Sequence, residues 1–287
     1  MKPARRKALI KANEPLRSHW QQQRRTFPPV ALTIAGSDNS GGAGIQADLK
    51  TFTTLRTYGA SAITSLVAEH PGRVHSIAPV PLSMVIDQIR LVFEAFPVAA
   101  IKTGMLYSRS NIAAVARELR QLAPGVPLVV DPVMVATSGA LLLKKDAIAV
   151  LQKELLPLAT LVTPNRDEAA LLWGHPIKDL ETLCAAGIEL SLKYQTAFLV
   201  KGGHLRGTHA IDLLCTGTKV RVFKTAMIAG ANPHGTGCTL SAAITASLAQ
   251  GLPVEKAVAA GKKFITHAVR THFQHGPHQV LNVLPRR

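Results

Sequence analysis

The sequence predicts an α/β domain with a mostly parallel central sheet and helices on both of its faces. Short apolar runs rich in β-branched residues alternate with segments whose apolar residues recur at helical spacing. Strands that are apolar on both sides are typical of sheets covered on both faces, and their alternation with helices is typical of parallel crossovers. The chain of 287 residues shows no internal repeat or interdomain linker, so one large domain is expected.

The elements can be assigned in chain order from Pro29 onward. The runs expected to form buried strands are Val30–Ala35, Ala62–Ala68, Val98–Lys102, Leu128–Asp131, Leu161–Thr163 and Ala197–Lys201. The helical segments between them are Ala43–Leu55, Met84–Phe93, Asn111–Leu122, Ala147–Leu155 and Leu180–Lys193. The chain then continues with an antiparallel hairpin near the sheet edge (Ala210–Leu214 and Val220–Phe223) and two closing helices (Thr236–Gln250 and Val254–Thr271).

The bulk composition excludes several classes of protein. Hydrophobic residues make up 47% of the chain, which is ample for a buried core and unlike a disordered chain. No apolar run approaches the ~20 residues that a membrane span needs, and the first residues lack the apolar stretch of a secretory signal. The three cysteines, Cys184, Cys215 and Cys238, form no C-x-x-C pair. They argue against a disulfide framework and a zinc site, so we expect a cytoplasmic protein.

Positive charge is concentrated at the N-terminus. The formal net charge is +16, and the first 28 residues carry eight lysines and arginines against one acid, Glu14. We expect residues 1–28 to be a poorly ordered basic extension and residues 29–287 to be the folded domain. The alternative is an arm that binds nucleic acid or a membrane surface. Because the segment has no aromatic residue before Phe27 except Trp20, and no clear amphipathic spacing, neither partner is expected.

A glycine-rich turn leads into the first closing helix. The run Asn232–Ser241 reads N-P-H-G-T-G-C-T-L-S. Glycines allow the backbone to approach an anion closely, and the first N–H groups of a helix have no partner within it, so the turn suits a phosphate group. Cys238 would lie in the first turn, where a thiolate is stabilised. The alternative is an ordinary helix start with a buried cysteine.

This turn and several motifs in register with it resemble the hydroxymethylpyrimidine/phosphomethylpyrimidine kinases of thiamine biosynthesis. Those enzymes belong to the ribokinase-like superfamily, and pyridoxal kinases are near relatives. The matching runs are Ala31–Lys50, Lys102–Leu106, Val130–Met134, Thr163–Glu168, Lys201–His204 and His234–Ser241. The resemblance, which extends from Ala31 to about Pro277, implies a ribokinase-like three-layer αβα fold and a kinase that uses ATP and Mg²⁺. It also implies a homodimer, which is common in the family.

The resemblance implies roles at the phosphate end of the site. Gly235, Thr236 and Gly237 resemble the anion hole for the transferred phosphoryl group, and Cys238 takes the position of the catalytic base. The remaining residues implied here are Asn165, Lys201, Gly203 and Lys262 for ATP, and Glu168 and Asp131 for the metal ion.

The residues alone leave plainer alternatives open at this end. Asn165 and Glu168 have the spacing of a capping box at a helix start. Asp131 fits a turn or helix-cap aspartate, the Lys201-Gly-Gly run fits a turn, and Lys262 fits a surface lysine.

The acceptor end shows one departure from the family. Gly36, Asp48, Val67 and Met105 match positions that line the pyrimidine site, although Asp48 alone would be interpreted as a solvated carboxylate. Glu69 stands where the familiar enterobacterial-type enzymes carry glutamine. A glutamine amide both donates and accepts, whereas an ionised glutamate only accepts. Glu69 would therefore bind an aminopyrimidine only if the ring nitrogen or the carboxyl group were protonated, and burial favours the neutral acid. The alternative is that Glu69 points away from the ring.

The resemblance implies phosphorylation of 4-amino-5-hydroxymethyl-2-methylpyrimidine and then of its monophosphate to the diphosphate. Pyridoxal kinase activity is the alternative within the same class. A non-catalytic protein that binds a ligand or nucleic acid on a kinase fold is the alternative from another class.

Overall fold

The structure, a computed structural model, describes residues 27–70, 73–134, 143, 145–203 and 208–285. The predicted basic extension, residues 1–28, lies outside the described residues apart from Phe27 and Pro28. His204, at the end of one matching run, also lies outside them.

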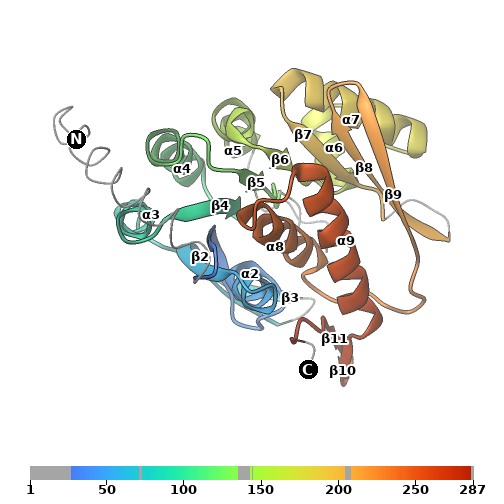
Figure 1. Ribbon diagram of the computed structural model, residues 1–287, viewed down its shortest axis with the longest axis horizontal. Coiled ribbons are helices and arrows are strands. Elements are labelled where there is room, and N and C mark those ends of the chain that lie inside the picture. Colours follow the sequence, from blue (N-terminus) through green and yellow to red (C-terminus); the bar gives the residue numbers. More distant parts are fainter. Residues whose placement is uncertain (1–26, 71–72, 135–142, 144, 204–207, 286–287) are drawn as a thin grey trace.

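A nine-stranded sheet forms the centre of the molecule (Figure 1), with strand order β3-β2-β1-β4-β5-β6-β7-β8-β9. The inner strands pair in parallel and are β1 (Val30–Asp38), β2 (Tyr58–His70), β4 (Val98–Thr103), β5 (Leu128–Val130), β6 (Leu161–Val162) and β7 (Ala197–Lys201). The antiparallel edge strands are β3 (Arg73–Pro79) on one side and the hairpin β8 (His209–Thr216) and β9 (Lys219–Ala226) on the other. The predicted parallel sheet and edge hairpin are confirmed.

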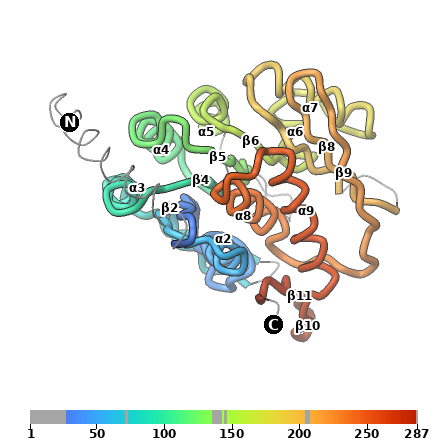
Figure 2. The backbone as a smooth tube through the Cα atoms, viewed as in Figure 1, coloured from blue at the N-terminus to red at the C-terminus, as the bar shows by residue number. Residues whose placement is uncertain are grey.

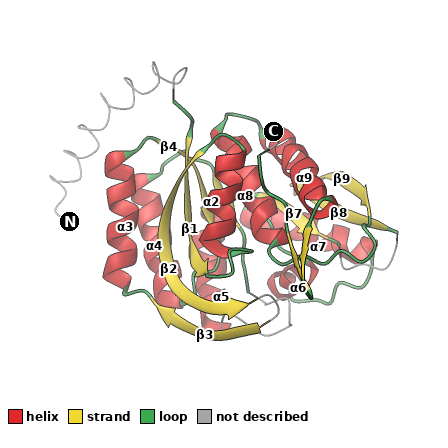
Figure 3. Ribbon diagram, turned by 90° about the horizontal axis from the view of Figure 1, so that it is seen from below, coloured by secondary structure: helices red, strands yellow, loops and turns green. Residues whose placement is uncertain are grey.

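Helices cover both faces of this sheet, which gives three layers (Figure 3). One face carries α3 (Leu82–Ala95), α4 (Arg109–Leu122), α5 (Lys145–Val150), α6 (Arg166–Trp173) and α7 (Leu180–Tyr194). The other face carries α2 (Gly44–Thr54), α8 (Thr236–Ala249) and α9 (Val254–Arg270). Figure 2 shows α2, from the first part of the chain, beside α8, from the last, and the two helices are in contact. None of the helices in the described ranges is long and apolar enough to cross a bilayer.

The strands are apolar on both sides because both of their faces are buried. On β1, Leu32 and Ile34 belong to the core under α3–α7, while Ala31 belongs to the core under α2, α8 and α9. On β7, Phe198 and Leu199 divide between the two cores in the same way. Side chains alternate across a strand, so a strand buried on both faces appears in the sequence as a continuous apolar run.

Three features differ from the prediction. The predicted helix Ala147–Leu155 divides into α5 and a π-helical turn at Leu151–Leu155. Strand β3 and the small hairpin of β10 (Phe273–His275) and β11 (His278–Val280) were not predicted. All three of these strands lack fully buried residues, so they carry no run of core side chains by which sequence could identify them.

The topology brings separate loops to one edge of the sheet. Strands β1, β4, β5, β6 and β7 are parallel, so their carboxyl ends meet at the same edge. Helices α2 and α6 follow β1 and β6 directly and begin at that edge. Ligands of open α/β sheets bind in the crevice beyond the carboxyl ends of the strands, so the site is expected there.

Close packing of α7 on the sheet can be tested at Gly187. A Cβ atom on Gly187 would lie 2.5 Å from Cys215 Sγ. Alanine in a helix interior is normally more stable than glycine by about 1 kcal/mol. Overpacking costs about 1–3 kcal/mol, so we expect Gly187→Ala to lower the free energy of unfolding. With the sulfur removed by Cys215→Ala, the same substitution should be neutral or stabilising. Urea unfolding of the single and double variants measures both effects, and an equal change in both backgrounds would contradict this packing.

Candidate active site

The turn before α8 has the geometry of an anion-binding site. Gly235 caps the helix with φ of 83°, and a Cβ atom there would overlap the carbonyl oxygen of Gly42. Only glycine therefore fits this position. The first helical hydrogen bond of α8 runs from the Thr239 amide to the Gly235 carbonyl oxygen. The preceding amides, of Thr236, Gly237 and Cys238, have no acceptor within the helix and are available to an anion. We call His234–Cys238 the anion turn.

An ion pair lies against this turn. Lys201 Nζ is 3.5 Å from Asp131 Oδ1, and the Ser241 hydroxyl donates to Asp131 Oδ2 at 3.1 Å. A Cβ atom on Gly237 would lie 3.3 Å from Lys201 Nζ and 3.8 Å from Asp131 Oδ2. Burial works against the charge of Lys201, but Asp131 and Glu168 raise the pKa of its ammonium group overall. Lys201 is therefore a cation beside the anion turn.

Asn165 and Glu168 form a capping box at the start of α6. Asn165 Oδ1 accepts from the amides of Asp167 and Glu168, each at 2.9 Å, and Glu168 Oε2 accepts from the Asn165 amide at 2.9 Å. Glu168 Oε1 accepts from the Met134 amide at 3.0 Å. Burial raises the pKa of Glu168, and Lys201 opposes this rise. The capping alternative is thus confirmed, and both carboxylate oxygens of Glu168 accept backbone hydrogen bonds.

Lys262 is not a surface lysine. It is 8% exposed, and its Nζ lies 2.6 Å from Asp212 Oδ2. Asp212 Oδ1 accepts from the Gly202 amide at 3.2 Å, so the pair lies beside the turn that contains Gly203. The alternative that Lys262 is a surface lysine was wrong. The adjacent Lys263 made the position look exposed in the sequence. Asp212 was missed, although an aspartate inside the apolar strand Ala210–Leu214 was an available signal.

The surroundings of Cys238 favour its thiol form. Burial raises its pKa to about 11, with Lys102 opposing the rise and Asp131 and Asp48 adding to it. These shifts run against the expected thiolate, because burial and two carboxylates favour the protonated form.

Asp48 is enclosed in the core and is not solvated. Its Oδ2 accepts from Lys102 Nζ at 2.9 Å and from the Thr33 hydroxyl at 2.6 Å, and both charged side chains have no exposed surface. Burial raises the pKa of Asp48, while Lys102 lowers it. The alternative of a solvated carboxylate was wrong. The pair supports the acceptor end from below, and Lys102 was not identified from the sequence.

The other predicted acceptor residues come together above this pair. The Gly36 amide donates to the Met105 carbonyl oxygen at 3.1 Å, and a Cβ atom on Gly36 would lie 2.8 Å from Met105 Cε and from Ser65 Oγ. Val67 on β2 pairs with Asp38 on β1. The ends of β1 and β2 and the loop after β4 therefore meet at Gly36.

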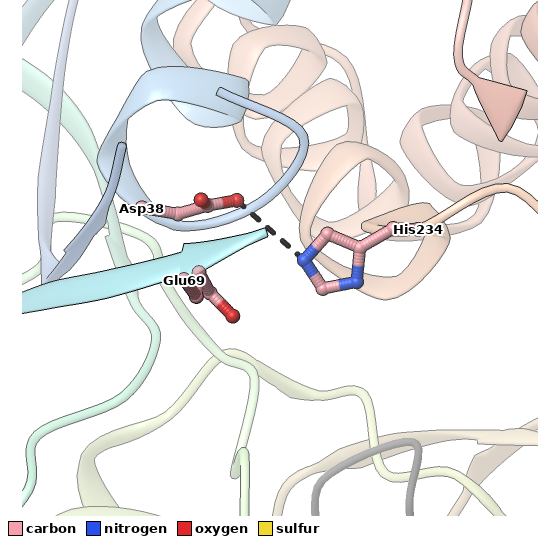
Figure 4. Close-up of side chains that lie close together, drawn as sticks. All are labelled: Asp38, Glu69 and His234. Atoms are coloured by element: carbon pink, nitrogen blue, oxygen red, sulfur yellow. Dashed lines mark ion pairs between the residues drawn. The ribbon is translucent and has the colours of Figure 1, made fainter. Parts of the chain in front are cut away.

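Glu69 lies in a cluster with Asp38 and His234 (Figure 4). One carboxylate oxygen or ring nitrogen of each residue lies within 4.8 Å of the others, and Asp38 Oδ2 is 3.5 Å from His234 Nε2. Burial raises the pKa of Glu69, Asp38 adds to this rise, and His234 opposes it. Such groups also bind cations, but the oxygens of Asp38 already accept three hydrogen bonds, which favours an ionic network. Asp38 and His234 were missed as functional residues, although both lie in the matching motifs.

Comparison with known proteins decides the family. The model of the family described as phosphomethylpyrimidine kinase matches residues 38–283. The chain belongs to this family. A hydroxymethylpyrimidine/phosphomethylpyrimidine kinase of Rhizobium meliloti is 49% identical over 241 residues, which cover 84% of this chain and 90% of that protein.

Solved structures agree with this membership. The crystal structure of phosphomethylpyrimidine kinase from Clostridium difficile is 41% identical, with a TM-score of 0.75, and the match covers 84% of this chain and 99% of that one. A pyridoxal kinase of Bacillus subtilis, solved as an ADP complex, is 36% identical, with a TM-score of 0.80, and the match covers 88% and 96%. The ribokinase-like fold and the kinase class that the resemblance implied are confirmed.

The anion turn can be tested by comparing two glycines with positive φ. We expect Gly235→Ala to push the turn away from the Gly42 carbonyl group and misplace its amides, lowering kcat by about a hundredfold, the loss typical of one missing donor to a developing charge. Gly230 has φ of 71° but open space around its Cβ position, so Gly230→Ala should lose only about 1–2 kcal/mol of stability to backbone strain. Circular dichroism checks that both variants fold. Equal kinetic losses in the two would argue against a specific role of the turn.

Proposed function

We propose that this family member is a hydroxymethylpyrimidine and phosphomethylpyrimidine kinase of thiamine biosynthesis. ATP would give its γ-phosphoryl group to 4-amino-5-hydroxymethyl-2-methylpyrimidine and, in a second reaction, to the monophosphate. The observation that carries the proposal is the junction of a glycine anion turn with the acceptor end at Gly42 and Gly235. The name of the Rhizobium meliloti relative supports the choice of acceptor.

The charges at the phosphate end suit phosphoryl transfer. In this reaction the protein contributes chiefly positioning and electrostatic stabilisation. The free amides of Thr236 and Gly237 and the ammonium group of Lys201 would stabilise the charge of the transferred group. Asn165, Gly203 and Lys262 lie around the turns after β6 and β7 and would bind the rest of the nucleotide. The Bacillus subtilis relative, which was solved with ADP, supports use of an adenine nucleotide.

The carboxylates of Asp131 and Glu168 fit a magnesium ion held partly through water. Both lie at the carboxyl edge of the sheet, and Mg²⁺ usually keeps several waters and takes only one or two carboxylates. Bound there, the ion would neutralise phosphate charge during transfer. Asp131 also accepts from Ser241 and pairs with Lys201, so each carboxylate would reach the ion through its remaining lone pairs or through water.

Gly36, Val67, Met105 and Glu69 would line the acceptor pocket, with Asp48 beneath it. The absence of a side chain at Gly36 keeps the space beside Met105 open, since a Cβ atom there would lie 2.8 Å from the methionine. An ionised Glu69 would accept from the exocyclic amine of the pyrimidine, and a neutral one would donate to its ring nitrogen.

Pyridoxal kinase activity is the second candidate. The observation that favours it is the close structural match to solved pyridoxal kinases, with TM-scores of 0.80 for the Bacillus subtilis enzyme and 0.81 for the Staphylococcus aureus enzyme. A pyridine ring with a hydroxymethyl group would present its alcohol to the same anion turn.

The domain organisation, oligomeric state and location of the enzyme are also proposed. Residues 29–287 would be one kinase domain after a basic extension of residues 1–28. The domain would act as a homodimer in the cytoplasm, without a membrane or nucleic-acid partner.

Turnover with competing acceptors tests the function. We expect purified full-length protein with ATP and Mg²⁺ to convert hydroxymethylpyrimidine and its monophosphate to the diphosphate, with products resolved by mass spectrometry. Omitting Mg²⁺ should abolish both reactions. Turnover of pyridoxal alone would replace the proposed acceptor but keep phosphoryl transfer, and no turnover of any acceptor would favour a non-catalytic protein.

Cys238→Ala separates two roles of the cysteine. The alcohol must lose a proton when it attacks, whereas the monophosphate is already largely ionised near neutral pH because its second pKa is about 6. If Cys238 acts as the base, the first transfer should slow by about a hundredfold and the second by much less. Single-turnover rates for each acceptor measure the difference. Equal slowing would show that the side chain only shapes the anion turn.

A further inference from the structure

Asp38 organises the loop that follows β1. Its Oδ1 accepts from the Ser40 amide at 2.7 Å, and its Oδ2 accepts from the Ser40 hydroxyl at 2.9 Å and the Ala43 amide at 2.7 Å. The carboxylate is 1% exposed. We call residues 39–43 the acceptor loop, and three of the hydrogen bonds that shape it end on this one side chain.

His234 fixes the anion turn to the same carboxylate. Its Nε2 is buried and makes no hydrogen bond within the described residues, and Asp38 Oδ2 lies 3.5 Å away as its ionic partner. A Cβ atom on Gly42 would lie 3.1 Å from the imidazole Cδ2, and Gly235 packs directly on the Gly42 carbonyl group. The acceptor loop and the anion turn therefore meet through backbone contact and one ion pair.

The pKa shifts agree with this ion pair. Burial opposes the charge of Asp38, but the contact with His234 and the hydrogen bonds from Ser40 and Ala43 lower its pKa overall. The close polar contact with Asp38 raises the pKa of His234, against burial, and the charges of Asp38 and Glu69 raise it further. Both shifts favour the charged forms, an imidazolium beside a carboxylate.

The end of β2 joins the same junction. The Glu69 amide donates to Asn39 Oδ1 at 2.6 Å, which ties the strand to the acceptor loop. Its carboxylate is the second negative group near His234. The other titratable groups around the junction are Lys50 on α2, which donates to the Gly41 carbonyl oxygen at 2.9 Å, and His70 on β2 and His278 on β11, whose ring centroids lie 5.8 Å apart.

We propose that Asp38 and His234 are positioning residues whose ion pair docks the anion turn onto the acceptor loop, and that the proton on His234 makes acceptor phosphorylation dependent on pH. This rests on the proposed function. The negative charge of Glu69 stabilises the protonated form of His234. Neither Asp38 nor His234 needs to touch the reacting atoms, since each acts through the loop that it holds.

The sign of the pH dependence follows from the raised pKa. An ordinary histidine has a pKa of about 6.5, and that of His234 lies above its usual value. The ion pair is fully present below the unfolded pKa and is lost as pH rises through the folded one. We therefore expect kcat/KM for the acceptor to fall on the alkaline side as His234 loses its proton.

Kinetic profiles of His234→Gln test the docking role. At neutral pH we expect kcat/KM for hydroxymethylpyrimidine to fall about tenfold, which corresponds to about 1.4 kcal/mol. Between about pH 6 and about pH 9, the alkaline limb that His234 sets should disappear. The matched control is His175→Gln, an exposed histidine that contacts Trp173 away from the site and should keep the wild-type profile. A His234→Gln profile identical to that of the wild type would overturn the proposal.

NMR titration of the histidine side chains tests the ion pair without any turnover. The His234 pKa should lie above about 6.5 in the wild-type protein and fall in Glu69→Gln, which removes charge at nearly constant shape. A wild-type His234 pKa at or below the ordinary value would overturn the ion pair. Failure of the proposed function is distinguishable, because the protein would then phosphorylate none of the acceptors while the titration still reported on Asp38 and His234.

Discussion

Two lysine–aspartate pairs, one fully buried and one partly exposed at its lysine, are the constraint around which the site is arranged. Lys102 with Asp48 lies under the acceptor end, and Lys201 with Asp131 lies against the anion turn. An unpaired charge in such positions would cost several kcal/mol, so each lysine is tolerated only because the fold brings a carboxylate to it. Both pairs act on the Cys238 thiol, since the charges of Lys102, Asp131 and Asp48 all affect its pKa.

Backbone geometry joins these charges into one site. Gly235 must adopt a left-handed conformation against the Gly42 carbonyl group, so the start of α8 is fixed relative to the acceptor loop. On the same turn, Gly237 lies beside Lys201 and Asp131. Positioning of this kind matters in phosphoryl transfer because the protein contributes little covalent chemistry to the reaction.

Much of the fold could be predicted, because burial on both faces turns inner strands such as β1 and β7 into continuous apolar runs. The convergence of Asp131, Asn165 and Lys201 also followed from parallel strands that end at one edge. The partners of buried charges could not be predicted in this way. Lys102 meets Asp48 across 54 residues, and Lys262 meets Asp212 across 50, so only the tertiary structure reveals them. The ionisation of Cys238 was misjudged because a helix start is visible in sequence and burial is not.

The distribution of charge along the site bears on how one pocket would serve two acceptors. Lys201 lies beside Gly237 in the anion turn, whereas Asp38 and Glu69 lie beside His234, the first residue of that turn. The second acceptor of the proposed reaction carries a phosphate, which two uncompensated carboxylates would repel. A protonated His234 cancels one of these charges, and it does so at the residue that begins the anion turn. Protonation of His234 therefore has two effects in this proposal. It maintains the ion pair between the anion turn and the acceptor loop, and it lowers the electrostatic cost of binding the phosphorylated acceptor.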